Sequence, residues 1–103
     1  MPWILLLLAG LFEIAWAVGL KFTDSFTRLW PTIGTVAALV VSVVLLGLAA
    51  KSLPVGTAYA VWTGIGAAGT VLCGIAFLGE PATAMRFACV ALILCGVLGL
   101  KLA

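Results

Sequence analysis

The sequence contains no histidine and few charged residues: five residues are basic and three are acidic in a chain of 103. Without histidine, and with one acid inside its apolar runs, a zinc or iron site has little support. The cysteines also lie in apolar runs and show no C-x-x-C spacing, so we interpret them as small buried hydrophobes. They are Cys73, Cys89 and Cys95. We therefore expect no metal, no cofactor and no covalent chemistry.

The net charge is only +2 and the basic residues form no block, so we do not expect nucleic acid as a partner. Hydrophobic residues make up 66% of the chain, whereas a soluble domain is nearer to about half apolar. Four apolar runs of about twenty residues would use nearly the whole length. We predict an all-α membrane protein, a single domain over 1–103 whose four transmembrane helices span about residues 3–20, 32–50, 55–78 and 84–102.

The first apolar run carries one ionisable group, Glu13, near its middle. A carboxylate at the centre of a membrane helix costs about 2.5–3.5 kcal/mol on insertion scales, so such a group is a functional candidate. No Lys, Arg or His lies within another apolar run to pair with it. We predict a binding role for Glu13. The alternative is an acid that only holds helices together through a polar contact.

Small residues and one aromatic residue share the helical face of Glu13. Ala9 and Gly10 precede it, and Trp16 and Ala17 follow. Small residues let another backbone approach closely, and Trp16 offers a flat ring beside the carboxylate. We favour a site role for Trp16 over the alternative that it is a bulky packing residue.

Ser42 is the one polar group near mid-depth in the second run. Its hydroxyl either bonds back to a carbonyl of its own helix or orients Glu13 from a neighbouring helix. The connection after this run is very short, which predicts that the second and third helices are antiparallel neighbours.

The third run is rich in glycine and carries Tyr59, Trp62 and Gly66 on one face, at i, i+3 and i+7. We predict that the two aromatic side chains reach inward. Its glycines favour close helix contact or a bend. We assign Gly64 and Gly66 to packing or a hinge.

The connections are expected to hold the remaining charges. Pro31 suits the opening position of the second helix. Glu80 precedes Pro81 in a turn and is expected to be solvated, while Arg86 and Lys101 extend to headgroups from opposite ends of the fourth helix.

Four spans place both termini on one side of the membrane. That side holds Lys51, Lys101 and the terminal amine, and the other holds Lys21, Arg28 and Arg86, so the positive-inside rule gives no preferred orientation. Two inverted copies would rebuild the inverted repeat that larger transporters carry in one chain. We predict an antiparallel, dual-topology homodimer.

Three features together resemble the small multidrug resistance family: Glu13 in the first span, the FTRLWP connection, and LPVGTAYAVWTGIGA at the third span. The resemblance covers essentially the full chain. It implies four helices, an antiparallel homodimer in a bacterial-type plasma membrane, and proton-coupled export by alternating access.

Within that family, Trp16 in FEIAWA and the GIGAAGTVLCGIAFLGEP continuation resemble the guanidinium exporter subtype. The resemblance implies that Glu13 binds cation or proton and that Trp16, Ser42, Tyr59 and Trp62 frame it.

Lys101 also matches the guanidinium exporter subtype, without an assigned role. Cys89 departs from the family pattern, in which a glycine can open the fourth-helix dimer motif.

Guanidinium presents paired N–H groups that match a carboxylate, and it can lie against indole faces. Protons would compete for the same oxygens, which predicts antiport of guanidinium and protons and no enzymatic activity. The alternatives are an exporter of hydrophobic quaternary ammonium cations on the same scaffold, a passive cation channel with Glu13 as a filter charge, and a membrane subunit that does not transport.

Overall fold

The computed structural model describes residues 2–103, which form four α-helices, one short 3-10 helix and no strand. The elements are α1 (Pro2–Gly19), η1 (Leu20–Phe22), α2 (Leu29–Ala50), α3 (Val55–Phe77) and α4 (Ala84–Leu102). Each of the four α-helices in this range is long and apolar enough to cross a membrane. The prediction of an all-α protein with four transmembrane helices is confirmed.

The ends of the helices follow from local chemistry. Helix α2 begins at Leu29, so Pro31 is its third residue rather than its first. Proline is tolerated there because the first N–H groups of a helix have no intrahelical acceptor. Helix α4 begins after Thr83, whose hydroxyl accepts the backbone N–H of Arg86 at 3.2 Å as an N-cap.

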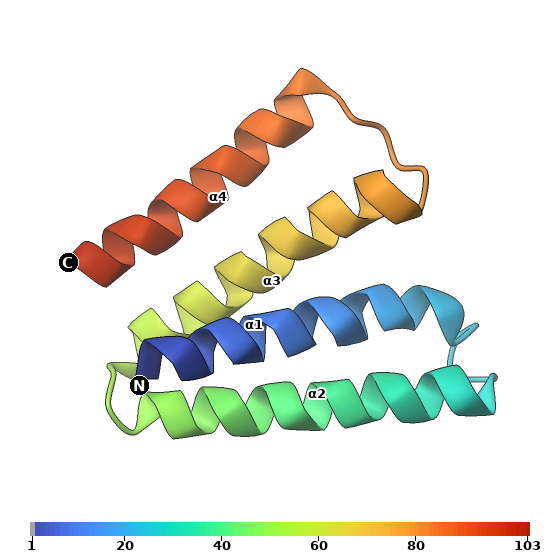
Figure 1. The fold of residues 1–103 in the computed structure, drawn as a ribbon, viewed down its shortest axis with the longest axis horizontal. Coiled ribbons are helices and arrows are strands. Elements are labelled where there is room, and N and C mark those ends of the chain that lie inside the picture. Colours follow the sequence, from blue (N-terminus) through green and yellow to red (C-terminus); the bar gives the residue numbers. More distant parts are fainter. Residues whose placement is uncertain (1) are drawn as a thin grey trace.

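The helices form one packed unit of three with the fourth set apart. Helix α1 packs against both α2 and α3, whereas α4 packs against α3 and diverges from the other two (Figure 1). Both ends of the described chain lie near the α2–α3 connection, and the other two connections lie at the opposite end (Figure 1). The buried core joins the first three helices through Leu6, Ala49, Ala58 and Val61.

Glycine lets α1 and α3 approach closely. A Cβ atom added to Gly10 would overlap the side chain of Ile65, and one added to Gly69 would overlap Ile14. Because contacts advance in the same direction along both helices, α1 and α3 run parallel. Helix α3 runs without interruption from Val55 to Phe77, and four of its five glycines lie in close contact with side chains outside the helix: Gly64, Gly66, Gly69 and Gly74.

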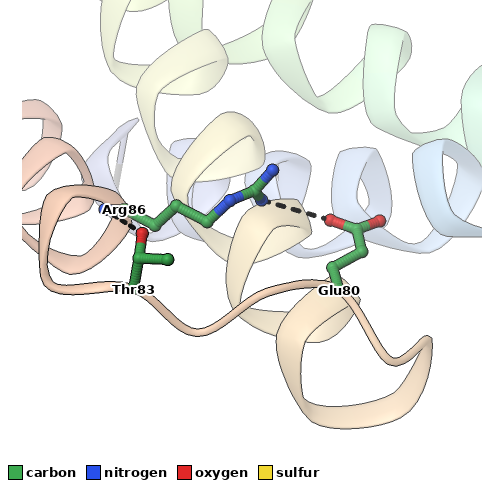
Figure 2. A network of polar contacts seen from close by, with 3 residues as sticks. All are labelled: Glu80, Thr83 and Arg86. Carbon is green, nitrogen blue, oxygen red and sulfur yellow. Dashed lines mark hydrogen bonds and ion pairs between the residues drawn. The ribbon is translucent and has the colours of Figure 1, made fainter.

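The α3–α4 connection holds an ion pair that the sequence did not predict. Arg86 lies 3.5 Å from the carboxylate of Glu80, and both side chains are half-buried (Figure 2). The Glu80 carboxylate lies against Gly74, whose carbonyl also accepts the Glu80 N–H at 3.1 Å. Glu80 keeps 39% of its side chain exposed, as expected for a residue in a turn, but it also has partners within the protein, because the missing side chain at Gly74 leaves room for the carboxylate.

Lys101, near the end of α4, also has a partner within the protein. Its ammonium lies 5.7 Å from the centre of the Trp3 ring, a cation–π contact between α4 and the start of α1.

Candidate functional site

The carboxyl group of Glu13 lies between α1 and α3, directly against Gly66. A Cβ atom added to Gly66 would overlap the carboxyl carbon and Oε2 of Glu13. Gly66 is buried and Glu13 is half-buried. The Oε2 atom is itself buried and has no hydrogen-bond partner among residues 2–103. The site is therefore a half-buried acid at the contact of two helices, with an acceptor oxygen that is unpaired among residues 2–103.

Ser42 connects three helices beside this acid. Its buried hydroxyl donates to the carbonyl oxygen of Ala9 on α1 at 2.6 Å and accepts the indole N–H of Trp62 on α3 at 2.8 Å. The sequence offered two alternatives for the Ser42 hydroxyl, a bond to a carbonyl of its own helix or a bond that orients Glu13. Neither describes this arrangement, because the acceptor is the carbonyl of Ala9 on α1. Ala9 is small and fully buried, which lets the serine reach its backbone.

The Ala9 carbonyl links Ser42 to Glu13 indirectly. In a regular α-helix this carbonyl accepts the N–H of the residue four positions later, which is Glu13. Ser42 therefore helps to fix the turn of α1 that carries the acid, and Trp62 fixes the orientation of Ser42.

The aromatic residues differ in how deeply they are enclosed. Trp62 is half-buried, and its ring centre lies 5.7 Å from that of Tyr59. Tyr59 is 57% exposed, so a single chain does not enclose it as the sequence predicted. Trp16 lies one helical turn after Glu13, half-buried, and its buried indole N–H has no partner among residues 2–103.

The structure separates the two glycines that the sequence placed together. Gly66 faces Glu13, whereas a Cβ atom added to Gly64 would meet Val97 and Ile93 on α4. Gly66 therefore belongs to the surroundings of the acid, and Gly64 belongs to a helix–helix contact.

Sequence reasoning missed two threonines on the helical face that carries Gly66. The hydroxyl oxygens of Thr63 and Thr70 are buried and have no hydrogen-bond partner in the part of the chain that the structure describes. Their positions, three residues before and four after Gly66, were the available signal. These positions indicate a role only because Gly66 faces Glu13, and the sequence does not show that contact.

Other parts of the molecule offer less chemistry. No three His, Cys, Asp or Glu side chains lie close enough together within residues 2–103 to hold a metal ion. An open hollow on α1 is lined by Leu8, Leu11, Phe12 and Ala15, which lie on the helix face opposite Glu13. That face is apolar and suits lipid contact rather than a charged ligand.

The chain is therefore a membrane protein with four spans and a half-buried carboxyl group between two of them. One oxygen of this group is unpaired among residues 2–103, so the group has the chemistry to hold a cation or a proton. Residues 1–93 match the family described as Small Multidrug Resistance protein. The guanidinium exporter of Escherichia coli (strain K12) is 61% identical over 102 residues, which cover 99% of this chain and 97% of that protein. The guanidinium exporters of Citrobacter freundii and Salmonella typhimurium are each 57% identical over the same shares of both chains.

The chain belongs to the Small Multidrug Resistance protein family, as its motifs indicated. It is a multi-pass protein of the plasma membrane and a transport protein rather than an enzyme.

Proposed function

We propose that this protein exports guanidinium ion across the plasma membrane in exchange for protons, by alternating access. The observation that carries the proposal is the carboxyl group of Glu13, which lies against Gly66 with a buried oxygen that no group among residues 2–103 engages. An intramembrane carboxylate that has no cationic partner among the described residues is suited to a cation that arrives from outside.

Guanidinium is the cation that best fits this site. Its planar N–H pairs match the two oxygens of a carboxylate, as in arginine–carboxylate pairs. The indoles of Trp16 and Trp62 offer faces for cation–π contact, worth about 2 kcal/mol in a desolvated site. The relatives with 57–61% identity are named guanidinium exporters, which supports the same substrate here.

Proton coupling follows from competition for the same oxygens. A protonated Glu13 cannot pair with a cation, and a cation-bound Glu13 cannot hold a proton. If the site opens to one side of the membrane at a time, each inward passage of protons permits one outward passage of cation. Coupling then needs no second ionisable site.

We further propose that two copies assemble in inverted orientations. In one chain Tyr59 is exposed and α4 packs against α3 while diverging from α1 and α2, so the site is open on one side. A second copy would cover that side and add its own Glu13. The positive charges are balanced between the two membrane sides, which favours neither insertion.

Transport by reconstituted protein tests the proposal. Wild-type proteoliposomes on a solid-supported membrane should give guanidinium-driven currents, and a higher proton concentration on the guanidinium side should raise the KM for guanidinium. Glu13→Gln should abolish the currents while the protein remains folded. Glu80→Gln is the matched control, because it removes a carboxylate outside the spans, and its currents should persist.

The rival functions give different results. Voltage-driven conductance without proton dependence would indicate a channel. Aggregation of Glu13→Gln without a folded dimer would assign Glu13 to helix packing. Currents carried by tetraalkylammonium ions, with guanidinium inactive, would indicate the quaternary ammonium specificity.

Labelling tests the inverted pair. A cysteine placed at residue 103, in a variant without the three native cysteines, should react with an impermeant thiol reagent about equally from each membrane side. Reaction from one side alone would contradict dual topology.

A further inference from the structure

Two threonine hydroxyls flank the point where α3 meets the Glu13 carboxyl group. Thr63 and Thr70 lie three residues before and four residues after Gly66, on the same helical face. Their Oγ1 atoms are buried and have no hydrogen-bond partner among residues 2–103, not even a carbonyl of their own helix. A buried threonine in a helix can bond the carbonyl four residues earlier, and neither of these hydroxyls makes that bond.

Helix geometry places both hydroxyls near the acid. The Cβ position of Gly66 coincides with the Glu13 carboxyl group. Cβ atoms three or four residues apart on a helix are about 5–6 Å apart. A cation that donates one N–H to the carboxylate and another to a threonine, with each N···O distance about 2.9 Å, bridges two oxygens separated by a similar distance. A cation on the carboxylate can therefore reach either threonine.

The chemistry of guanidinium requires such groups. The ion has donors on all three nitrogens and no acceptor, and a carboxylate engages only the edge that faces it. The remaining N–H groups need acceptors once they leave water, because an unpaired buried donor is costly. The Trp16 indole is a donor only, and the Ser42 hydroxyl already donates to Ala9 and accepts the N–H of Trp62, which leaves it one acceptor lone pair.

We propose that Thr63 and Thr70 are substrate-positioning residues, whose hydroxyls accept N–H groups of a guanidinium ion held at Glu13. Thr63 lies toward the α2–α3 connection and Thr70 toward the α3–α4 connection, so the ion has one acceptor on each side of the carboxylate. This inference rests on the proposed function, and it assigns the selectivity for donor-rich cations to these two hydroxyls.

Thr63→Val and Thr70→Val remove each hydroxyl and keep the side-chain shape. In proteoliposome currents, each variant should raise the KM for guanidinium roughly three- to tenfold, as expected for one lost hydrogen bond, with the maximal current kept within about twofold. Thr63→Ser and Thr70→Ser retain the hydroxyl and should restore the wild-type KM.

The substrate provides the second arm of the experiment. In 1,1-dimethylguanidinium one nitrogen has lost both donors, while the opposite edge still fits the carboxylate. Wild-type protein should prefer guanidinium, and the valine variants should reduce that preference by about the same three- to tenfold factor. An equal loss for both cations would assign the threonines to packing and overturn the inference.

Thr32→Val is the matched control. Its hydroxyl is also buried without a partner among residues 2–103, but it lies at the start of α2, beyond the end of α1. Its KM should match that of wild type.

The two proposals fail separately. Wild-type protein that gives no guanidinium current would contradict the proposed function. Normal wild-type currents with Thr63→Val and Thr70→Val both within twofold of wild type would contradict only the role of the hydroxyls.

Discussion

Gly64 and Gly66 lie two positions apart on α3 and contact different helices. The two positions point about 200° apart around the helix. Gly64 meets the hydrocarbon side chains of Val97 and Ile93 on α4, and Gly66 meets the carboxyl group of Glu13 on α1. The same residue type, in the same G-x-G segment, thus makes room for a branched alkyl group on one face and for an ionisable group on the other.

The difference shows how one helix separates assembly from binding. At Gly64, the face of α3 toward α4 packs against hydrocarbon side chains, as expected where close packing drives the association of helices in lipid. The face toward α1 and α2 also carries the bond from Trp62 to Ser42 and the acid at Gly66. Changes on the first face should alter stability, and changes on the second should alter transport.

Among the changes that test this comparison, Gly66→Ala should give the largest effect. The backbone at this position is helical, so alanine is compatible with it, but the new Cβ would displace the Glu13 carboxyl group. Losing a well-placed carboxylate–guanidinium contact should raise the guanidinium KM at least about tenfold. Gly47→Ala is the control, because nothing lies within 4 Å of its added Cβ. Unchanged transport by Gly66→Ala would show that the carboxyl group functions elsewhere.

Gly64→Ala should act on stability instead. Its Cβ would overlap a methyl group of Val97, whose branched side chain has little freedom to move. Overpacking of this kind costs about 1–3 kcal/mol, which thermal unfolding in detergent would detect. Val97→Ala in the same chain should recover most of the loss. The comparison fails if Gly64→Ala raises the guanidinium KM as much as Gly66→Ala.

Ser42→Ala should have a smaller effect on both properties. It leaves the indole N–H of Trp62 without its acceptor and removes the bond to the Ala9 carbonyl. Interhelical hydrogen bonds in membranes contribute about 0.6 kcal/mol on average and up to about 1.7. A double-mutant cycle with Trp62→Phe, measured by unfolding, should therefore give less than the sum of the two single changes. Strict additivity would show that the two side chains are not coupled.

Arg86→Gln should have the smallest effect. The pair with Glu80 is half-exposed at 3.5 Å, and ion pairs of this kind contribute less than about 1 kcal/mol. The loss in thermal stability should shrink further in high salt, because exposed charges are screened. A large loss that salt does not change would mean that the connection is part of the packed structure.

Much of the fold could be predicted from the sequence because the bilayer restricts the choices. The lengths of the apolar runs predicted four helices, and the position of Glu13 near the middle of the first run predicted a site within the membrane. The spacing of Tyr59, Trp62 and Gly66 placed them on one face of α3. Gly66 contacts the carboxyl group of Glu13 directly. Trp62 donates to Ser42, which in turn bonds the turn of α1 that carries Glu13.

The partners of polar groups could not be predicted in the same way. Ser42 bonds the backbone of Ala9, and a backbone carbonyl is present at every position, so no sequence signal distinguishes it. Glu80 was expected in water but pairs with Arg86 and lies against Gly74. The sequence does not show that Thr63 and Thr70 lie on the side of α3 that faces Glu13, because this depends on the orientation of α3 relative to α1.

By itself, the sequence determined that this chain lies in a membrane, that it crosses four times, and that one carboxyl group is carried to the middle of the first span. Hydropathy and length are enough for this, because a bilayer selects for helices of fixed length. Only the tertiary structure decided which glycine receives the acid and which side chains of α3 share the face of that glycine. The rotation of one helix about its axis against another is set by the fit of side chains between them, and that fit depends on both surfaces at once.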